Sequence, residues 1–223
     1  MDNASLIKKA IRSWGFKQIG RFKLYRIEND ILFYLLVESG YSILTSYGFK
    51  PLFVPPPAEF LTLEFSERVL YRFHDLPYIS KKTDPAVIDE FCVKLEQLYH
   101  SQLQPFFSEY STAEKLMEWA NRSLISRDKD DYLPLTIDLD WRRILMYGNA
   151  YLGNYAEAVK EASTYIDSLN TKYRYRYTTD VLQKWIGEAN DLIDLVTKAD
   201  PSGIQARFQE WREQNFRVFG IKA

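Results

Sequence analysis

The sequence predicts an α+β protein, in which an N-terminal helix on a small antiparallel sheet is followed by an all-helical C-terminal part. Up to about residue 83, short apolar runs are separated by turn residues, and from residue 84 onward apolar residues recur at the helical spacing of 3.6. The charge changes at the same point, because residues 1–83 have a net charge of +4 and residues 84–223 a net charge of −5. We therefore expect two parts, 1–80 and 84–223, and the sequence leaves open whether they share one core.

The N-terminal part begins with a helix and continues as strands. Apolar residues from Leu6 to Trp14 recur at helical spacing, and Gly15 stands where a helix would end. A run that is apolar on both faces, 31–37, predicts a central strand covered by a helix. Together the strands are predicted at 21–27, 31–37, 42–49, 60–66 and 69–73.

The C-terminal part carries clear helix-start signals. Asp84-Pro85 and Asp200-Pro201 each offer an N-cap followed by a first-turn proline. Ser111 and Glu114 have the spacing of a capping box, and Asn154 precedes another apolar stripe. About six helices are predicted here, in a bundle or an array of hairpins.

Two stretches resemble known families. The helix that ends in Gly15-Phe16, the basic strand 20–27 and the apolar strand that follows resemble uncharacterised bacterial domains of unknown function, over about residues 5–75. That resemblance implies that residues 5–75 fold as such a strand meander, and it implies nothing about an activity. Residues 147–158 resemble the turn of one tetratricopeptide hairpin, in which Gly148 would let two helices approach and Gly153 would make the reversal. No second copy stands at a period of 34, so we expect a single helical hairpin.

Composition excludes several classes of protein. The chain has 223 residues, a net charge of −1 and one cysteine, so a protein wholly built to neutralise phosphates and an intramolecular disulfide are both excluded. No cationic start followed by an apolar run is present, and no run reaches the length of a membrane span. We expect a cytoplasmic protein that contacts no membrane.

Catalytic motifs are absent from the sequence. No phosphate-binding glycine loop, no nucleophile elbow and no repeated Cys or His spacing occurs, so we expect no cofactor and no metal. Cys92 lies on a predicted apolar helix face, where a buried and inert thiol is the default. The only histidines are His74 and His100, and we expect His74, beside Asp75, to be structural or at the surface.

An acidic cluster is the second candidate for chemistry. Its members are Asp128, Asp130, Asp131, Asp138 and Asp140. It lacks the glycine and the terminal glutamate of an EF-hand loop, so we interpret it as a solvated loop in which Asp138 or Asp140 caps the next helix. A divalent cation or a basic partner is the alternative.

The segment 172–177 is the most unusual in the chain, because lysine or arginine alternates with tyrosine. In a strand the cations and the rings would occupy opposite faces, as in proteins that stack single-stranded bases. In a helix or loop, the rings would instead cover an apolar seam. The candidate binding residues are Tyr173, Arg174, Tyr175 and Arg176.

These observations favour a non-enzymatic bacterial protein-interaction module, of the immunity or adaptor kind, with an unidentified protein partner. The abundance of tyrosine and tryptophan suits an interface, and no catalytic set is visible. Two alternatives stay open: an enzyme whose site is assembled from dispersed residues such as His74 or the pair Asp138 and Asp140, and a single-stranded nucleic-acid binder that uses Lys172 to Tyr177. Of these partners we expect a protein, not a nucleic acid.

Overall fold

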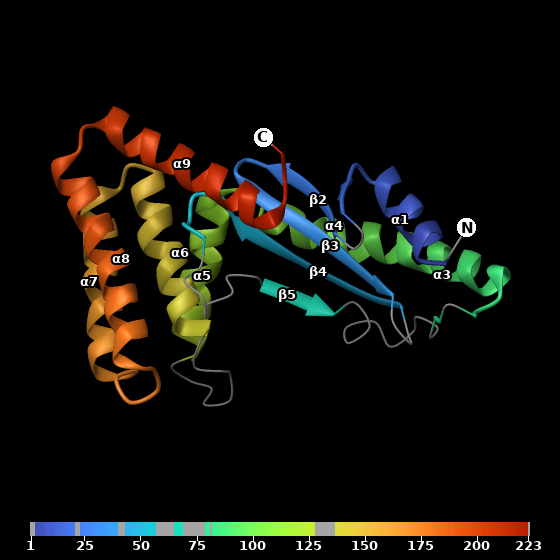
Figure 1. Ribbon diagram of the computed structural model, residues 1–223, viewed down its shortest axis with the longest axis horizontal. Helices are drawn as coiled ribbons and strands as arrows, with labels where there is room; N and C mark the ends of the chain where they lie inside the picture. The colour runs from blue at the N-terminus through green and yellow to red at the C-terminus, as the bar shows by residue number, and fades with distance from the viewer. Residues whose placement is uncertain are drawn as a thin grey trace. The chain divides into compact units, whose positions relative to one another are not determined.

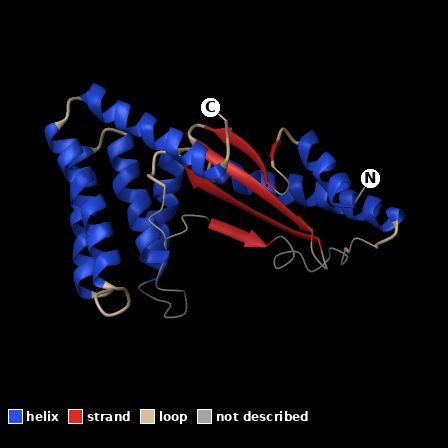
Figure 2. Ribbon diagram, in the orientation of Figure 1, coloured by secondary structure: helices blue, strands red, loops and turns tan. Residues whose placement is uncertain are grey.

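The computed structural model describes residues 3–20, 23–39, 43–56, 65–68, 79–80, 82–127 and 137–222. The chain forms two compact units. Unit 1 comprises Met1–Lys50 with Glu64–Ser111, and unit 2 comprises Pro51–Leu63 with Thr112–Ala223. Figure 2 shows that strands belong to one part of the chain and that the C-terminal part is helical, so the predicted α+β class is confirmed.

Unit 1 is built on an antiparallel meander, because its strands follow one another in the sheet in the order β1-β2-β3-β4-β5. The strands are β1 (Lys17–Ile19), β2 (Lys23–Glu28), β3 (Ile31–Ser39), β4 (Ile43–Pro51) and β5 (Phe65–Arg68). Asn29 and Asp30 both have positive φ, which is the geometry of the tight turn that joins β2 to β3. Residues 31–35 of β3 are all buried, so the prediction of a central strand covered on both faces is confirmed. Of the two further predicted strands, 60–64 and 69–73 lie outside the described residues.

Aromatic side chains join the helices of unit 1 to its sheet. The helices are α1 (Asn3–Ser13), α3 (Pro85–Leu98), the π-helix η1 (Tyr99–Leu103) and α4 (Gln104–Glu109). The rings of Trp14 and Tyr99 stack at 4.3 Å between centroids, and Phe107 packs against Phe33 of β3 at 4.9 Å. These contacts place 85–109 in the same unit as the sheet, which differs from the division predicted between residues 80 and 84.

Unit 2 is an array of consecutive helices (Figure 1). They are α5 (Ala113–Arg127), α6 (Ile137–Tyr151), α7 (Tyr155–Thr171), α8 (Thr179–Lys198) and α9 (Pro201–Phe219). Helix α5 packs on α6, α6 on α7 and α7 on α8, and α9 lies across the end of this array at which α8 finishes. The predicted hairpin of α6 and α7 is present, and Gly153 makes its reversal with φ of 81°.

The C-terminal half of α9 holds residues 52–54 to unit 2. Asn215 is completely buried, and its Nδ2 donates hydrogen bonds to the carbonyl oxygens of Leu52 at 3.2 Å and Val54 at 2.7 Å. The side chains of Leu52, Phe53 and Val54 are themselves buried. A single amide therefore satisfies two main-chain acceptors that have been removed from water.

The predicted helix starts are partly confirmed. The carboxylate of Asp84 accepts from the amide of Ala86, and that of Asp200 accepts from the amide of Gly203, so both predicted N-caps are correct. The predicted cap at Ser111 is wrong, because the hydroxyl of Thr112 accepts from the amide of Lys115 at the start of α5. Ser111 instead donates to a carbonyl of the preceding turn.

The close approach at Gly148 also differs from the prediction. We expected this glycine to let the two helices of the hairpin α6–α7 approach. A Cβ atom added at Gly148 would instead lie 2.7 Å from Sδ and 2.8 Å from Cγ of Met117, which belongs to α5. The glycine is therefore needed where α6 crosses α5.

Candidate functional site

The segment predicted to bind a partner is the loop between α7 and α8. Tyr173 is only 1% exposed, so the structure places this candidate in the core. Arg174, Tyr175 and Arg176 follow as an exposed turn, in which the amide of Arg176 donates to the carbonyl oxygen of Tyr173 at 2.9 Å. The candidates therefore separate into one anchor and three surface residues. We call Arg174, Tyr175 and Arg176 the α7–α8 tip.

The tip presents an aromatic ring between two cations. Tyr175 is 88% exposed, which is unusual for a large aromatic side chain, and the guanidinium carbon of Arg174 lies 5.6 Å from the centroid of its ring. On the other side of the tip, the ring of Tyr177 packs edge-on against buried Trp185 of α8, 4.8 Å between centroids. Both ends of the tip are thus anchored by tyrosines that contact the helical core.

A cluster of polar side chains lies in the helical array; Asp140, Arg143, Tyr147 and Tyr165 are buried, and the side chain of Glu188 is 24% exposed. It consists of Asp140, Arg143 and Tyr147 from α6, Tyr165 from α7 and Glu188 from α8. We call these five residues the buried cluster. Their spacing along α6, three and then four residues, puts the three α6 members on one face of that helix.

Arg143 is the centre of the buried cluster. Its side chain is 0% exposed, and Nη2 lies 3.2 Å from Oε2 of Glu188. Among the described residues, however, none of its three guanidinium nitrogens has an acceptor in hydrogen-bond geometry, and the same holds for Oδ1 of Asp140 and the hydroxyl of Tyr165. A buried guanidinium held by charge more than by aligned hydrogen bonds is a costly arrangement, and it depends on the charges around it.

Burial governs the protonation of the carboxyl groups in the cluster. Asp140 is 8% exposed, and burial raises its pKa from an ordinary 3.8 to about 7 against the opposing effect of Arg143. Burial also raises the pKa of Glu188, again opposed by Arg143. Burial by itself would lower the pKa of Arg143, but the surrounding tyrosine and carboxyl groups outweigh it and raise that pKa, so Arg143 remains a cation.

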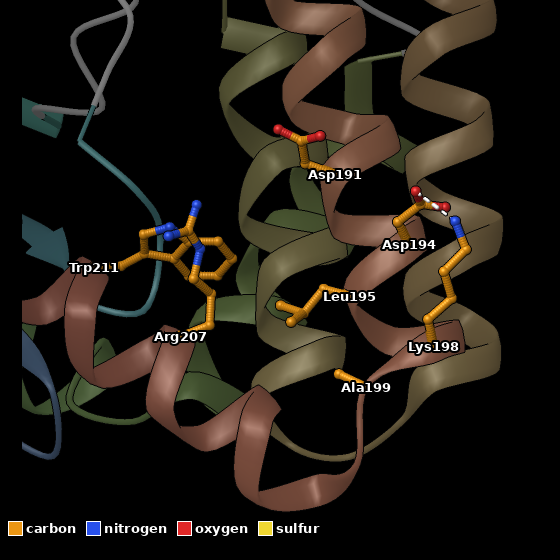
Figure 3. A pocket seen from close by; sticks show the side chains of 7 residues that line it. All are labelled: Asp191, Asp194, Leu195, Lys198, Ala199, Arg207 and Trp211. Atoms are coloured by element: carbon orange, nitrogen blue, oxygen red, sulfur yellow. Dashed lines mark ion pairs between the residues drawn. The ribbon is translucent and has the colours of Figure 1, made fainter.

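A pocket of about 580 Å³ opens between α8 and α9 in the same unit (Figure 3). Its lining residues are Asp191, Asp194, Leu195, Lys198, Ala199, Arg207 and Trp211. Lys198 pairs with Asp194 at 2.7 Å, and Arg207 pairs with Glu210 and lies 5.5 Å from the centroid of the Trp211 ring. Most of the charge in this pocket is therefore neutralised by neighbours on the same helix.

Most of the remaining sequence candidates fall outside the described part of the chain. His74, Asp128, Asp130 and Asp131 lie outside the described residues, and the side chain of Asp138 is likewise not described. His100 is exposed beside Gln104, and burial, followed by the charge of Asp89, raises the pKa of the Cys92 thiol. Within the described ranges, no group of three or more His, Cys, Asp or Glu side chains could hold a metal ion.

Asp140 requires a correction. We expected Asp138 or Asp140 to cap a helix, but α6 already begins at Ile137 and Asp140 is a buried member of its first turn. The sequence interpretation also missed Arg143, Tyr165 and Glu188. The signal was present on α6, where a carboxyl, a guanidinium and a phenol at positions 140, 143 and 147 share one face with apolar residues.

No protein-family model, no curated protein and no solved structure matches this chain. In the part of the chain that the structure describes, every helix is too short or too polar to cross a lipid bilayer.

Proposed function

We propose that this chain is a non-enzymatic protein-interaction module, of the bacterial immunity or adaptor kind, that binds an acidic protein partner through the α7–α8 tip. The observation that carries the proposal is Tyr175, which is 88% exposed between two exposed arginines. Tyrosine and arginine are enriched among the residues that dominate binding energy at protein interfaces. An exposed ring of this size has no role in the core of its own unit.

The mounting of the tip supports the proposal. The tip follows α7 directly, and the amides of Lys172 and Tyr173 donate to the carbonyl oxygen of Ser168 at 2.9 and 3.1 Å. Tyr173 and Tyr177 are held against the helical core on either side. A loop ordered in this way loses less conformational entropy on binding than a free one does.

The charge of the tip indicates the kind of partner. Arg174 and Arg176 are both exposed, and so is neighbouring Lys172. These cations favour an acidic surface, where they raise the association rate and select against basic partners. The same charges could attract nucleic acid, but stacking of successive bases needs several accessible rings, and Tyr173 is buried while Tyr177 packs on Trp185.

The test places a photo-crosslinking phenylalanine analogue at position 175 of the full chain in its native host. We expect one discrete covalent adduct with a protein, and none with the same analogue at Val218, an exposed position on α9. Arg174→Glu with Arg176→Glu should abolish the adduct and weaken binding of the purified partner at least about tenfold. The matched double reversal Arg217→Glu with Lys222→Glu changes two other exposed cations and should have little effect.

Two outcomes contradict the proposal. One is the absence of any adduct specific to position 175. The other is tight binding of a single-stranded oligonucleotide, measured by fluorescence anisotropy, that weakens steeply with added salt and is lost in the double tip variant. That result would replace the protein partner with a nucleic acid.

A further inference from the structure

The buried cluster is linked to the α7–α8 tip through Tyr177 and Trp185. Burial raises the pKa of Tyr177, the second anchor of the tip, and the negative charge of Asp140 raises it further. Tyr177 in turn contacts Trp185, one turn of α8 before the Glu188 member of the cluster. The charge on Asp140 therefore acts electrostatically on Tyr177, the second anchor of the proposed binding loop.

The charges in the cluster cancel when only one of its two carboxyl groups is ionised. With Asp140 protonated, the cation of Arg143 faces one carboxylate, that of Glu188, and the buried charges cancel. When Asp140 loses its proton, two carboxylates share one guanidinium and the cluster has a net charge of −1. An uncompensated charge away from water is strongly unfavourable in a protein interior.

Groups from every packed element face this centre. They are Arg143 and Tyr147 from α6, Tyr165 from α7, Glu188 from α8 with Lys184 and Asp191 acting on it, and Tyr177 with Arg176 from the loop. The α5 residues Glu114, Lys115, Glu118 and Arg122 are exposed to solvent. At the rim, Arg142 pairs with Glu161 at 3.6 Å. Arg143 is the only cation within the buried cluster.

We propose that the buried cluster is a proton-dependent clamp, which holds α6, α7 and α8 together while Asp140 is protonated and loosens the anchor of the α7–α8 tip when that proton leaves. The role of the clamp in regulating a partner rests on the proposed function of the tip. The clamp itself is a property of the free chain.

The sign of the effect follows from proton linkage. Asp140 binds its proton more tightly in the folded chain, with a pKa of about 7, than in the unfolded chain, where the ordinary value is 3.8. The folded state therefore holds more protons over this interval, and stability falls as the pH rises from about 4 to about 7. Above that interval both states are ionised and the contribution levels off.

The experiment compares the full chain with Asp140→Asn, which has nearly the shape of the protonated residue and cannot ionise. Urea unfolding is followed at several pH values, and Asp167→Asn, a change at an exposed α7 aspartate, is the matched control. Between about pH 5.5 and about pH 8, we expect the unfolding constant of the unsubstituted chain to rise about 30-fold relative to that of Asp140→Asn. The Asp167→Asn chain should follow the unsubstituted chain.

Two further measurements extend the test. Carboxyl carbon shifts of the unsubstituted chain, labelled at aspartate, should contain one titration near neutral pH that is missing from Asp140→Asn. Hydrogen exchange corrected for intrinsic rates should show that the amides of Tyr173 and Arg176 lose protection from about pH 6 to about pH 8 in the unsubstituted chain and keep it in Asp140→Asn. If Asp140→Asn does not fold, the carboxylate is required and the clamp is refuted.

Failure of the clamp can be separated from failure of the proposed function. If every aspartate titrates in the ordinary acidic range, or if Asp140→Asn shows the same pH dependence as the unsubstituted chain, the clamp is wrong whatever the crosslinking finds. If the clamp titrates as expected and position 175 yields no specific adduct, the regulated binding is wrong and the clamp stands as a stability device. Support for the whole inference needs the titration, the loss of amide protection and an adduct that weakens from about pH 6 to about pH 8 only when Asp140 is present.

Discussion

The hydrogen bonds of Asn215 allow a sharp test of how unit 2 is held together. Among the described contacts, the side-chain amide of Asn215 is the only hydrogen-bond donor from α9 to residues 52–54. Asn215→Ala removes this donor and leaves the carbonyl oxygens of Leu52 and Val54 without their hydrogen bonds. Each buried acceptor that loses its donor costs about 1–3 kcal/mol, and the small cavity adds to this. We expect the free energy of unfolding to fall by about 3–5 kcal/mol.

The assay is urea unfolding followed by tryptophan fluorescence. Four of the five tryptophans, Trp119, Trp141, Trp185 and Trp211, belong to unit 2, and the fifth, Trp14, belongs to unit 1. Limited proteolysis of the folded chain should in parallel show faster cleavage near Phe53, because the segment is less firmly held.

Two companion variants locate the cause in the Asn215 amide. Val218→Ala changes an exposed residue of the same helix and should alter stability by less than about 0.5 kcal/mol. Asn215→Asp keeps the size but turns a carboxylate toward two carbonyl oxygens, so it should cost more than alanine at neutral pH and recover in part on acidification. A loss below about 0.5 kcal/mol for Asn215→Ala would refute the reasoning.

Two further predictions concern a close contact and a helix cap. Gly148→Ala forces a methyl group against Met117, so it should lower the free energy of unfolding of unit 2 by about 1–3 kcal/mol, measured by urea unfolding. This loss should be smaller in a Met117→Ala background, where the methyl group has room. Equal losses in both backgrounds would contradict the contact. Asp200→Ala removes the acceptor for the amide of Gly203, so hydrogen exchange of the first amides of α9 should become faster. Hydrogen bonds from Gly203 and Ser202 lower the pKa of Asp200. The cap therefore stabilises the chain at pH values above the ordinary pKa of an aspartate, and this stabilisation is lost as the pH falls through the lowered pKa of Asp200 in the folded chain. An exchange difference that persists in strong acid would contradict the role of the carboxylate.

Local signals in the sequence predicted several of the elements, but they did not predict β1. The N-caps at Asp84 and Asp200 depend only on the next three residues and a following proline, so they can be recognised without any knowledge of the rest of the fold. The burial of β3 follows from its unbroken apolar run. Where two neighbouring residues could both cap, as at Ser111 and Thr112, the local pattern does not decide between them, and in the structure Thr112 is the cap.

Residues 172–177 stay a predicted binding segment, and their environment could not be read from the sequence. Alternation of cations and tyrosines singled out residues 172–177, yet the same pattern fits a strand, a helix or a loop. Only the packing of α7 against α8 decides that Tyr173 is an anchor and Tyr175 is exposed. Two tyrosines two positions apart thus have opposite environments.

By itself, the amino-acid sequence determined the α+β class, the succession of β2, β3 and β4 and the helix starts at Asp84 and Asp200, because these depend on periodicity and on residues that are neighbours in the chain. Only the tertiary structure decided that Asp140, Arg143 and Glu188 meet, and that Gly148 faces Met117. Such pairs come from different helices, and a buried charge is recognised as buried only when the elements that exclude water from it are in place. The same aspartate is an ordinary surface cap in one packing and a group that titrates near neutral pH in another.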